Sequence, residues 1–227
     1  MIFTKQIRSI SYYKVHSWYS GLIKPRQQKP PYYHVVQVGD PRLRNKAEQI
    51  PLDQIKTPEI QKLIKQMKCV LEKYECVGLS APQIGVNSRM FLMEFNENHK
   101  KHYSEKEFKL KEMLLVPFTV VINPEIKILD FDKVVYSESC ESVRGFWADV
   151  PRYRKLLLTG YNENAEEIQI EATGWVARII QHEMDHLSGT LYTDVMDGKT
   201  LTCVCWEAVK AVNERRGKVV LPFSPDA

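Results

Sequence analysis

The chain has 227 residues, of which 44% are hydrophobic and 26% charged, and this composition is typical of one globular domain with extensions. We expect no membrane-spanning helix, because no run of about 18 apolar residues occurs. The formal net charge of +4 comes from residues 1–39, which contain six basic residues and no acidic one. The other residues include 26 basic and 28 acidic ones, so they carry no general nucleic-acid-binding signature.

The first residues predict a targeting segment. They are basic, lack Asp and Glu, are rich in Ser and Tyr, and have no compact apolar stretch of the secretory kind. These features are typical of a mitochondrial transit peptide, and a basic tail without a targeting role is the alternative. We therefore divide the chain into an extension over 1–34 with a linker at 25–31, a folded domain over 35–216 and a tail over 217–227. The predicted location is the mitochondrial matrix.

Several segments have clear secondary-structure signals. An amphipathic helix is predicted after Thr57, a suitable N-cap, because proline and glutamate follow it and apolar residues recur at three- and four-residue spacing as far as Tyr74. Strands are predicted over 89–95, 113–123, 125–130, 133–137, 156–161 and 167–171, with a turn at 123–124 and a hairpin turn at 162–164. The remaining predictions are an extended segment over 35–38, a short strand near Leu191 and a final helix over 201–216.

Two segments lack a periodic pattern. Residues 96–112 are highly charged and contain His99 and His102, and we expect a solvated loop inserted between strands. Residues 76–85 are mostly small, so a substrate backbone can approach them closely, and Gln83 is a neutral donor able to contact a carbonyl oxygen. A plain connecting loop is the alternative for 76–85.

The strongest chemical signal lies in residues 172–190, which read ATGWVARIIQHEMDHLSGT. A helix is predicted because Thr173 can cap it, apolar residues repeat at helical spacing, and the glycine after the motif suits a left-handed C-terminal cap. His182 and His186 then share one helix face and can bind one metal ion, while Glu183 stands beside it as a proton-transfer group. This pattern indicates a hydrolytic metal site; two unrelated histidines flanking a glutamate are the alternative.

A catalytic metal ion usually has three protein ligands, and these residues leave the third one open. In one protease pattern a third histidine follows six residues after the second, but Tyr192 occupies that position. Glu207 would complete a different protease-like site. Cys140, at the end of a predicted strand, would complete a site with a thiolate. The five cysteines lack disulfide-scaffold spacing and are expected to be reduced, so a cysteine ligand is available.

Three motifs together resemble the signatures of the peptide deformylase family in order and spacing. They are GLSAPQIG at 78–85, Glu-x-Cys-x-Ser at 138–142 and QHEMDHLSG at 181–189, and the likeness covers roughly residues 35–210. With its basic leader, the chain resembles the mitochondrial members. The resemblance implies an α+β fold with small antiparallel β-sheets around a central metal-binding helix, and it makes 35–216 the catalytic domain.

The resemblance also assigns the metal site and the reaction. It implies that Cys140, His182 and His186 bind one divalent ion, either Fe²⁺ or Zn²⁺, with Co²⁺ as a substitute in vitro. Glu183 would be the catalytic acid and base. The implied reaction removes the formyl group from N-formyl-methionyl nascent peptides and releases formate. The mitochondrial ribosome is a candidate partner.

Further positions are assigned to the substrate. Gln83 and the backbone N–H of Glu141 would contact the formyl oxygen, and the peptide backbone would lie along Val77, Gly78, Ser139 and Glu141. The chain departs from the commonest bacterial pattern here, because Ser139 stands for a glycine and Glu141 for a leucine. A cysteine likewise stands for the glycine at the start of the first motif. No ligand is lost, but the glutamate changes the substrate pocket and therefore bears on substrate breadth and rate.

Two other functions remain open on the sequence. A different metallohydrolase would use Glu207 in place of Cys140 as the third ligand. A chain whose catalysis has faded would bind nascent peptides or the ribosome without hydrolysing a bond. The intact ligands, with Glu183 and Gln83, favour the enzyme.

Overall fold

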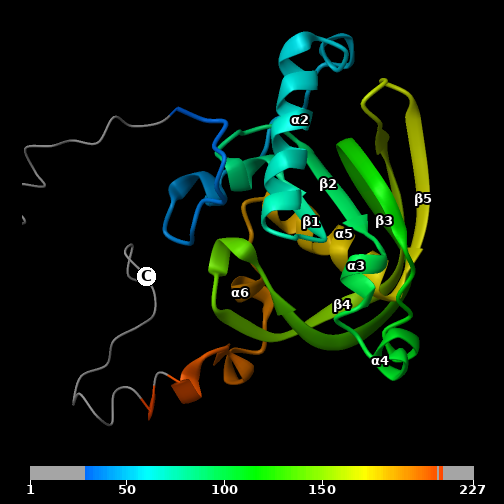
Figure 1. The fold of residues 1–227 in the computed structure, drawn as a ribbon. Coiled ribbons are helices and arrows are strands. Elements are labelled where there is room, and N and C mark those ends of the chain that lie inside the picture. Colours follow the sequence, from blue (N-terminus) through cyan, green and yellow to red (C-terminus); the bar gives the residue numbers. More distant parts are fainter. Residues whose placement is uncertain (1–28, 209, 212–227) are drawn as a thin grey trace, which may run out of the picture.

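The computed structural model describes residues 29–208 and 210–211 (Figure 1). Its helices are α2 Pro58–Lys73, α3 Glu97–Lys100, α4 Glu105–Leu110, α5 Gly174–Leu187 and α6 Tyr192–Val195. Its strands are β1 Gly78–Ser80, β2 Met90–Phe95, β3 Val116–Ser139, β4 Phe146–Tyr161, β5 Glu167–Thr173 and β6 Thr202–Cys203. Short 3₁₀ helices η1 to η5 cover Pro41–Arg44, Leu52–Gln54, Ala81–Ile84, Glu141–Val143 and Gly198–Thr200.

The described strands form one antiparallel sheet in the order β1-β2-β3-β4-β5, with β6 paired to β4. The α+β class is as expected, whereas the expectation of several small sheets is wrong. One sheet results because β3 has 24 residues and β4 has 16, and Figure 1 shows both curving around the centre of the molecule. These two strands connect regions of the sheet that shorter strands would leave separate.

The long strand β3 replaces three strands that the sequence predicts over 113–123, 125–130 and 133–137. The register with β4 shifts between Ile122 and Glu125 and twice more between Ile128 and Lys133, so each predicted break is an irregularity inside one strand. Asn123 has φ +50°, a left-handed conformation that asparagine tolerates better than most residues. The predicted turn there is a bulge, which bends the strand without ending it.

Strand β2 lies between two parts of the hydrophobic core. Met90 and Leu92 pack in the cluster that includes the buried face of α2, whereas Phe91 and Met93 pack in the cluster that includes α5. Alternate side chains of a strand point to opposite faces, so a strand covered on both sides is apolar at every position. This explains why residues 90–93 read as an unbroken apolar run.

Helix α5 begins immediately after β5, as the sequence predicts. Thr173 is its N-cap residue, and Gly189 after its end has φ +75°, the left-handed conformation expected there. Ten of the 14 residues of α5 are buried, and Figure 1 shows the helix in the middle of the fold, enclosed by β3 and β4. A helix buried on nearly all sides has little freedom to shift, which suits it to carry a precise site.

Some local predictions are wrong. Residues 35–37 are irregular and no strand forms there, Leu191 is the N-cap of α6, and 202–203 form a strand where a helix was expected. Residues 206–208 and 210–211 are helical, and residues 209 and 212–216 of the predicted final helix lie outside the described residues, as do the predicted tail and most of the extension. Within the described residues, no helix is long and apolar enough to cross a bilayer.

Candidate metal centre and active-site cavity

Three side chains from two elements converge on one point. Cys140 directly follows β3, and His182 and His186 project from α5. Their ligand atoms all lie within 4.8 Å of one another, and the Cys140 Sγ is 3.2 Å from Nε2 of His186. Two ligands that sit about 2.0–2.3 Å from a common ion are at most about 4.5 Å apart. The cluster therefore fits one metal ion with only small side-chain movements, and its one sulfur and two nitrogens suit Zn²⁺ or Fe²⁺.

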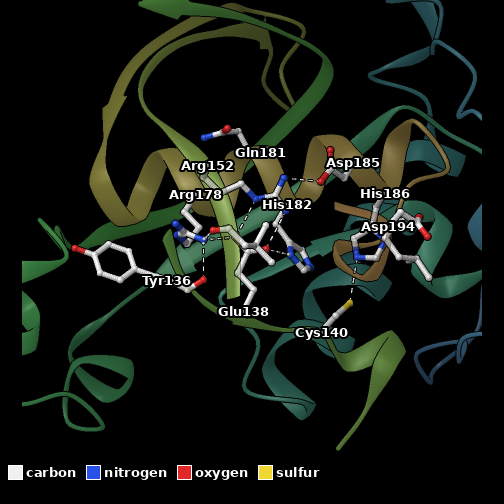
Figure 2. A network of polar contacts seen from close by, with 12 residues as sticks. Tyr136, Glu138, Cys140, Arg152, Arg178, Gln181, His182, Asp185, His186 and Asp194 are labelled. Carbon is white, nitrogen blue, oxygen red and sulfur yellow. Dashed lines mark hydrogen bonds and ion pairs between the residues drawn. The ribbon is translucent and has the colours of Figure 1, made fainter. Parts of the chain in front are cut away.

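The carboxylate of Glu138 holds the first histidine in place (Figure 2). Its Oε2 lies 3.1 Å from Nδ1 of His182, which fixes the ring and leaves Nε2 to face the cluster. The same carboxylate accepts two hydrogen bonds of 2.9 Å from Arg152 and one of 2.7 Å from Arg178. Each oxygen thus has two partners, and the carboxylate cannot rotate without losing buried hydrogen bonds.

Two arginines extend this network across the fold. Arg152, on β4, also donates to Asp185 of α5 at 2.6 Å, so one guanidinium ties β3, β4 and α5 together. Arg178, on α5, donates in addition to backbone carbonyl oxygens of both long strands, at Val134 and Val150. Figure 2 shows both guanidinium groups pointing at Glu138. The network fixes the helix that carries the histidines against the strand that delivers Cys140.

The network also sets protonation. Burial alone would raise the pKa of Glu138, but the hydrogen bonds and charges of Arg152 and His182 outweigh it and hold this pKa well below the usual range. Burial alone would lower the pKa of His182, but hydrogen bonds and charge from Cys140 and Glu138 raise it. Glu138 therefore stays ionised throughout the physiological range and acts as the fixed anion behind the cluster.

A cavity of about 330 Å³ opens beside the cluster. The sequence-predicted residues that line it come from the segment around β1, from the end of β3 and from α5: Val77, Gly78, Gln83, Ser139, Cys140, Glu141, His182 and Glu183. His186, the remaining predicted ligand, lies in the cluster itself. All nine predicted site residues are thus brought together, although they span more than 100 positions of the chain.

Glu183 lies at the cavity in surroundings that favour proton exchange. It is buried, its Oε2 has no hydrogen-bond partner, and burial raises its pKa to about 7. Gly78 lies against it, because a Cβ at position 78 would be only 2.9 Å from Cδ of Glu183. A carboxyl group that exchanges its proton near neutral pH is suited to general acid and base work.

Gln83 is held in one orientation. The segment predicted as a loop forms β1 and the 3₁₀ helix η3, and within it Oε1 of Gln83 accepts from the backbone N–H and the hydroxyl of Ser80 at 2.9 and 3.0 Å. Its Nε2 donates to Ser142 Oγ at 3.2 Å and faces the Cys140 Sγ at 3.7 Å. The amide N–H group is therefore directed toward the cluster, where it can contact a substrate oxygen.

The charged insertion forms one wall of the cavity. Most of its charged side chains are exposed, as predicted, but it folds into α3 and α4, and Tyr103 and Lys111 line the cavity together with Trp175 of α5. The Lys111 ammonium lies 5.2 Å from the ring centre of Tyr103 and 5.0 Å from that of Trp175. The backbone N–H of Trp175 donates to the Lys111 carbonyl at 3.0 Å. Calling this segment only a solvated loop is therefore wrong.

The alternatives for the third ligand lie elsewhere. Glu207 is exposed and does not belong to the cluster, and Tyr192 is buried beside His182, with ring centres 6.4 Å apart. His99 and His102 line a separate hollow of about 330 Å³ that also contains Cys76. Of the remaining histidines, the one at position 34 stacks on a tyrosine and the one at position 16 lies outside the described residues. Among the described residues, only Cys140, His182 and His186 form such a group.

Sequence reasoning missed the roles of Arg152, Arg178 and Lys111. Arg178 carries a detectable signal, because it lies four residues before His182 and therefore on the same helix face. Arg152 carries none, since its place depends on how β4 pairs with β3. The many charges around Lys111 indicate that its segment is exposed to solvent. The aromatic residues in and beside that segment are the one sequence feature that indicates packing.

The family model described as "Polypeptide deformylase" matches residues 32–201. The chain belongs to the peptide deformylase family. A relative in Homo sapiens, "Peptide deformylase, mitochondrial", is 42% identical over 80% of this chain and 74% of its own length. "Peptide deformylase 1A, chloroplastic" of Solanum lycopersicum is 37% identical over 82% of this chain and 67% of its own length.

Solved deformylase structures have the same fold. The crystal structure of peptide deformylase from Ehrlichia chaffeensis matches 82% of this chain and 97% of its own chain, with a TM-score of 0.63 and 27% identity. The likeness therefore extends from the sequence motifs to the arrangement of the sheet and helices around them.

Proposed function

We propose that the cavity beside Cys140, His182 and His186 is the site at which this deformylase removes the formyl group from the N-terminal methionine of newly made proteins. The observation that best supports this proposal is that three chemical features meet at the cavity. A compact sulfur and nitrogen cluster, a buried carboxyl group with an unpartnered oxygen and an oriented amide all face one cavity of about 330 Å³.

The three clustered residues would hold one divalent ion, Zn²⁺ or Fe²⁺. Such an ion supplies Lewis acidity and can lower the pKa of a water molecule from 15.7 to about 7. Cys140 would bring negative charge to the ion, and Glu138 behind His182 would orient the ring and make it a stronger ligand. The fold keeps these ligands in position through the network of Arg152 and Arg178.

Glu183 would move the proton. Its carboxylate accepts a proton from the water that attacks the formyl carbon and then gives it to the nitrogen that leaves as a free amine. Its pKa of about 7 suits both transfers near neutral pH. Glu183 is not among the clustered ligands. The products are formate and a peptide with a free amino terminus.

Gln83 and the backbone N–H of Glu141 would stabilise the formyl oxygen as it becomes negative. Loss of one such donor typically costs about 3–4 kcal/mol in the transition state. Ser80 already fixes the amide of Gln83, so no reorganisation is needed when charge develops. The peptide backbone would lie between Val77–Gly78, at the start of β1, and Ser139, at the end of β3, all of which line the cavity.

The same proposal places the enzyme in the mitochondrial matrix, with residues 35–216 as its catalytic domain and the mitochondrial ribosome as a candidate partner. The basic, acid-free extension and the mitochondrial relative support this location. A fluorescent fusion of residues 1–39 is expected in mitochondria, and a fusion that stays in the cytosol would contradict the location without affecting the reaction.

The test of the reaction is release of formate from a formyl-Met-Ala peptide. The purified chain is loaded anaerobically with Fe²⁺, Zn²⁺ or Co²⁺ in parallel, and formate is measured enzymatically. We expect release that depends on the ion, and the best ion identifies the cofactor. Stoichiometric ion binding without any formate would contradict the proposed activity and favour a non-catalytic binding role.

A further inference from the structure

Two thiols lie together outside the metal cluster and are not among the residues that line the cavity beside it. Cys203 ends β6, and Cys205 follows two positions later, after Val204, in the next turn. Their sulfur atoms are 3.6 Å apart and share a hydrogen bond. A disulfide bond is about 2.05 Å long, so rotation of the two side chains has to close only about 1.5 Å.

The backbone holds this pair in a defined place. β6 pairs with the start of β4, with Cys203 opposite Phe146, and the backbone N–H of Val204 donates to the Gly145 carbonyl at 2.8 Å. Backbone hydrogen bonds therefore hold the chain as far as Val204, between the two cysteines. Such a fixed turn keeps the two sulfurs at high effective concentration and lowers the entropy lost on closing the ring.

Small reactants can reach both thiols. Cys203 and Cys205 are half-buried, and the residues on either side of Cys205 are well exposed, Val204 at 63% and Trp206 at 51%. The hydrogen bond that the two sulfurs share is the first cause of a raised pKa at Cys205, and this favours Cys205 as the hydrogen donor of the pair. The thiolate form is the one that attacks a disulfide.

The other three cysteines offer no comparable pair. Cys76 is buried, and burial raises its pKa, which makes it unreactive. Cys140 belongs to the metal cluster. Cys69 is exposed on α2, and among the described residues only Cys203 and Cys205 join their sulfurs in a hydrogen bond. It therefore serves as an internal reference for an accessible, solitary cysteine.

We propose that Cys203 and Cys205 are a redox modification site, which forms an intramolecular disulfide by exchange with a low-molecular-weight disulfide of the glutathione type. The Cys203 thiolate attacks one sulfur of the reagent, whose S–S bond breaks and releases one glutathione thiolate. Cys205 then gives up its proton, attacks the Cys203 sulfur and releases the second glutathione. One reagent disulfide is reduced to two thiols while the two protein thiols are oxidised to one disulfide.

The test incubates the full chain in mixtures of reduced and oxidised glutathione. After acid quenching and alkylation of free thiols, mass spectrometry reads the peptides that carry the cysteines. We expect the peptide with Cys203 and Cys205 to become lighter by two hydrogen atoms and to retain no glutathione, while Cys69 acquires a glutathione mixed disulfide. Cys205→Ser is expected to trap glutathione on Cys203, because no second thiol remains to release it.

Dilution of the redox buffer distinguishes an intramolecular disulfide from a mixed disulfide with glutathione. At a fixed ratio of reduced to oxidised glutathione, a tenfold lower total concentration is expected to raise the ratio of disulfide to dithiol at the pair about tenfold, because two reduced molecules are released per disulfide. The extent of mixed disulfide at Cys69 is expected not to change. The proposal is overturned if the pair keeps glutathione as Cys69 does, follows the same dilution behaviour, or stays reduced where Cys69 reacts.

Discussion

The two sides of the metal cluster are built in opposite ways. Behind His182, every oxygen of the Glu138 carboxylate has two partners, and Arg152 and Arg178 link it to three elements. On the cavity side, polar atoms are buried without hydrogen-bond partners: Oε2 of Glu183, Oε2 of Glu141 and Nε1 of Trp175. Buried polar groups are normally satisfied. The fold completes the contacts of the carboxylate behind His182, whereas three polar atoms of the cavity side, and Nδ1 of His186 in the cluster itself, have no partner in the protein.

The largest effect is expected from removing the thiolate at the junction of the two sides. Cys140→Ala should lower metal content sharply and reduce formate release to background, because a catalytic ion usually needs three protein ligands. Metal is measured by mass spectrometry of the purified chain. Glu207→Ala is the matched control and should keep both metal and activity. Unchanged metal occupancy in Cys140→Ala would contradict the ligand assignment.

A change on the cavity side should affect chemistry and leave the ion bound. Glu183→Gln is expected to lower kcat about 10²–10⁴-fold, because the amide cannot accept the proton of the attacking water. Its metal content and unfolding temperature should stay close to those of the unchanged chain. Formate release at the normal rate would refute the acid and base role.

A change behind the cluster should cost stability. Glu138→Gln leaves the buried Arg178 without its anion and leaves Arg152 with Asp185 alone, and breaking such a buried pair typically costs about 3–5 kcal/mol. Glu141→Gln, the same chemical change on the cavity side, should cost under about 1 kcal/mol. Denaturant unfolding measures both. Equal costs for the two variants would remove the contrast between the two sides.

The pH dependence of that stability has a definite sign. The pKa of Glu138 is held below its usual range, so its contribution is fully present above the unfolded value of about 4.3 and is lost as pH falls through the lower folded value. The difference between the unchanged chain and Glu138→Gln should therefore be constant from neutral pH down to about pH 5 and shrink only in stronger acid. A difference that already shrinks between pH 7 and 6 would contradict this.

The smallest effect is expected at the wall that the insertion forms. Lys111→Ala removes a cation that lies over the rings of Tyr103 and Trp175, a contact worth about 0.5–1 kcal/mol at a partly exposed site. KM for a formyl-methionyl peptide should rise by up to about fivefold with little change in kcat. Lys109→Ala, an exposed neighbour on α4, should change neither. Equal KM values in both variants would deny the insertion a role in binding.

The sequence predicts the parts of this site that depend on local spacing. His182, Glu183 and His186 share a helix because of their spacing, and the motif around Cys140 identifies the third member of the cluster. The sequence does not predict the role of Arg152, because the position of this residue depends on the register between β3 and β4. A strand carries no signal of which residue will face it across a sheet, so contacts over long sequence separations appear only in the folded chain.

The irregular features were harder still. The turn signals near Asn123 indicate a chain reversal, but pairing with β4 continues past them, and tertiary structure turns the break into a bulge. In the insertion, Phe95 stacks against His99 and Phe108, so a few aromatic contacts fold a segment that its charges describe as solvated. The composition of the insertion reflects its many exposed charged residues, whereas its structure depends on the few aromatic residues that pack.

The absence of a side chain at Gly78 has a genetic consequence. Any missense change in a glycine codon adds at least one carbon, and at this position that carbon would lie 2.9 Å from Cδ of Glu183. The carboxyl group would have to move, so even alanine would displace the group that we propose transfers the proton. Selection for deformylation should therefore act against amino-acid variants at codon 78.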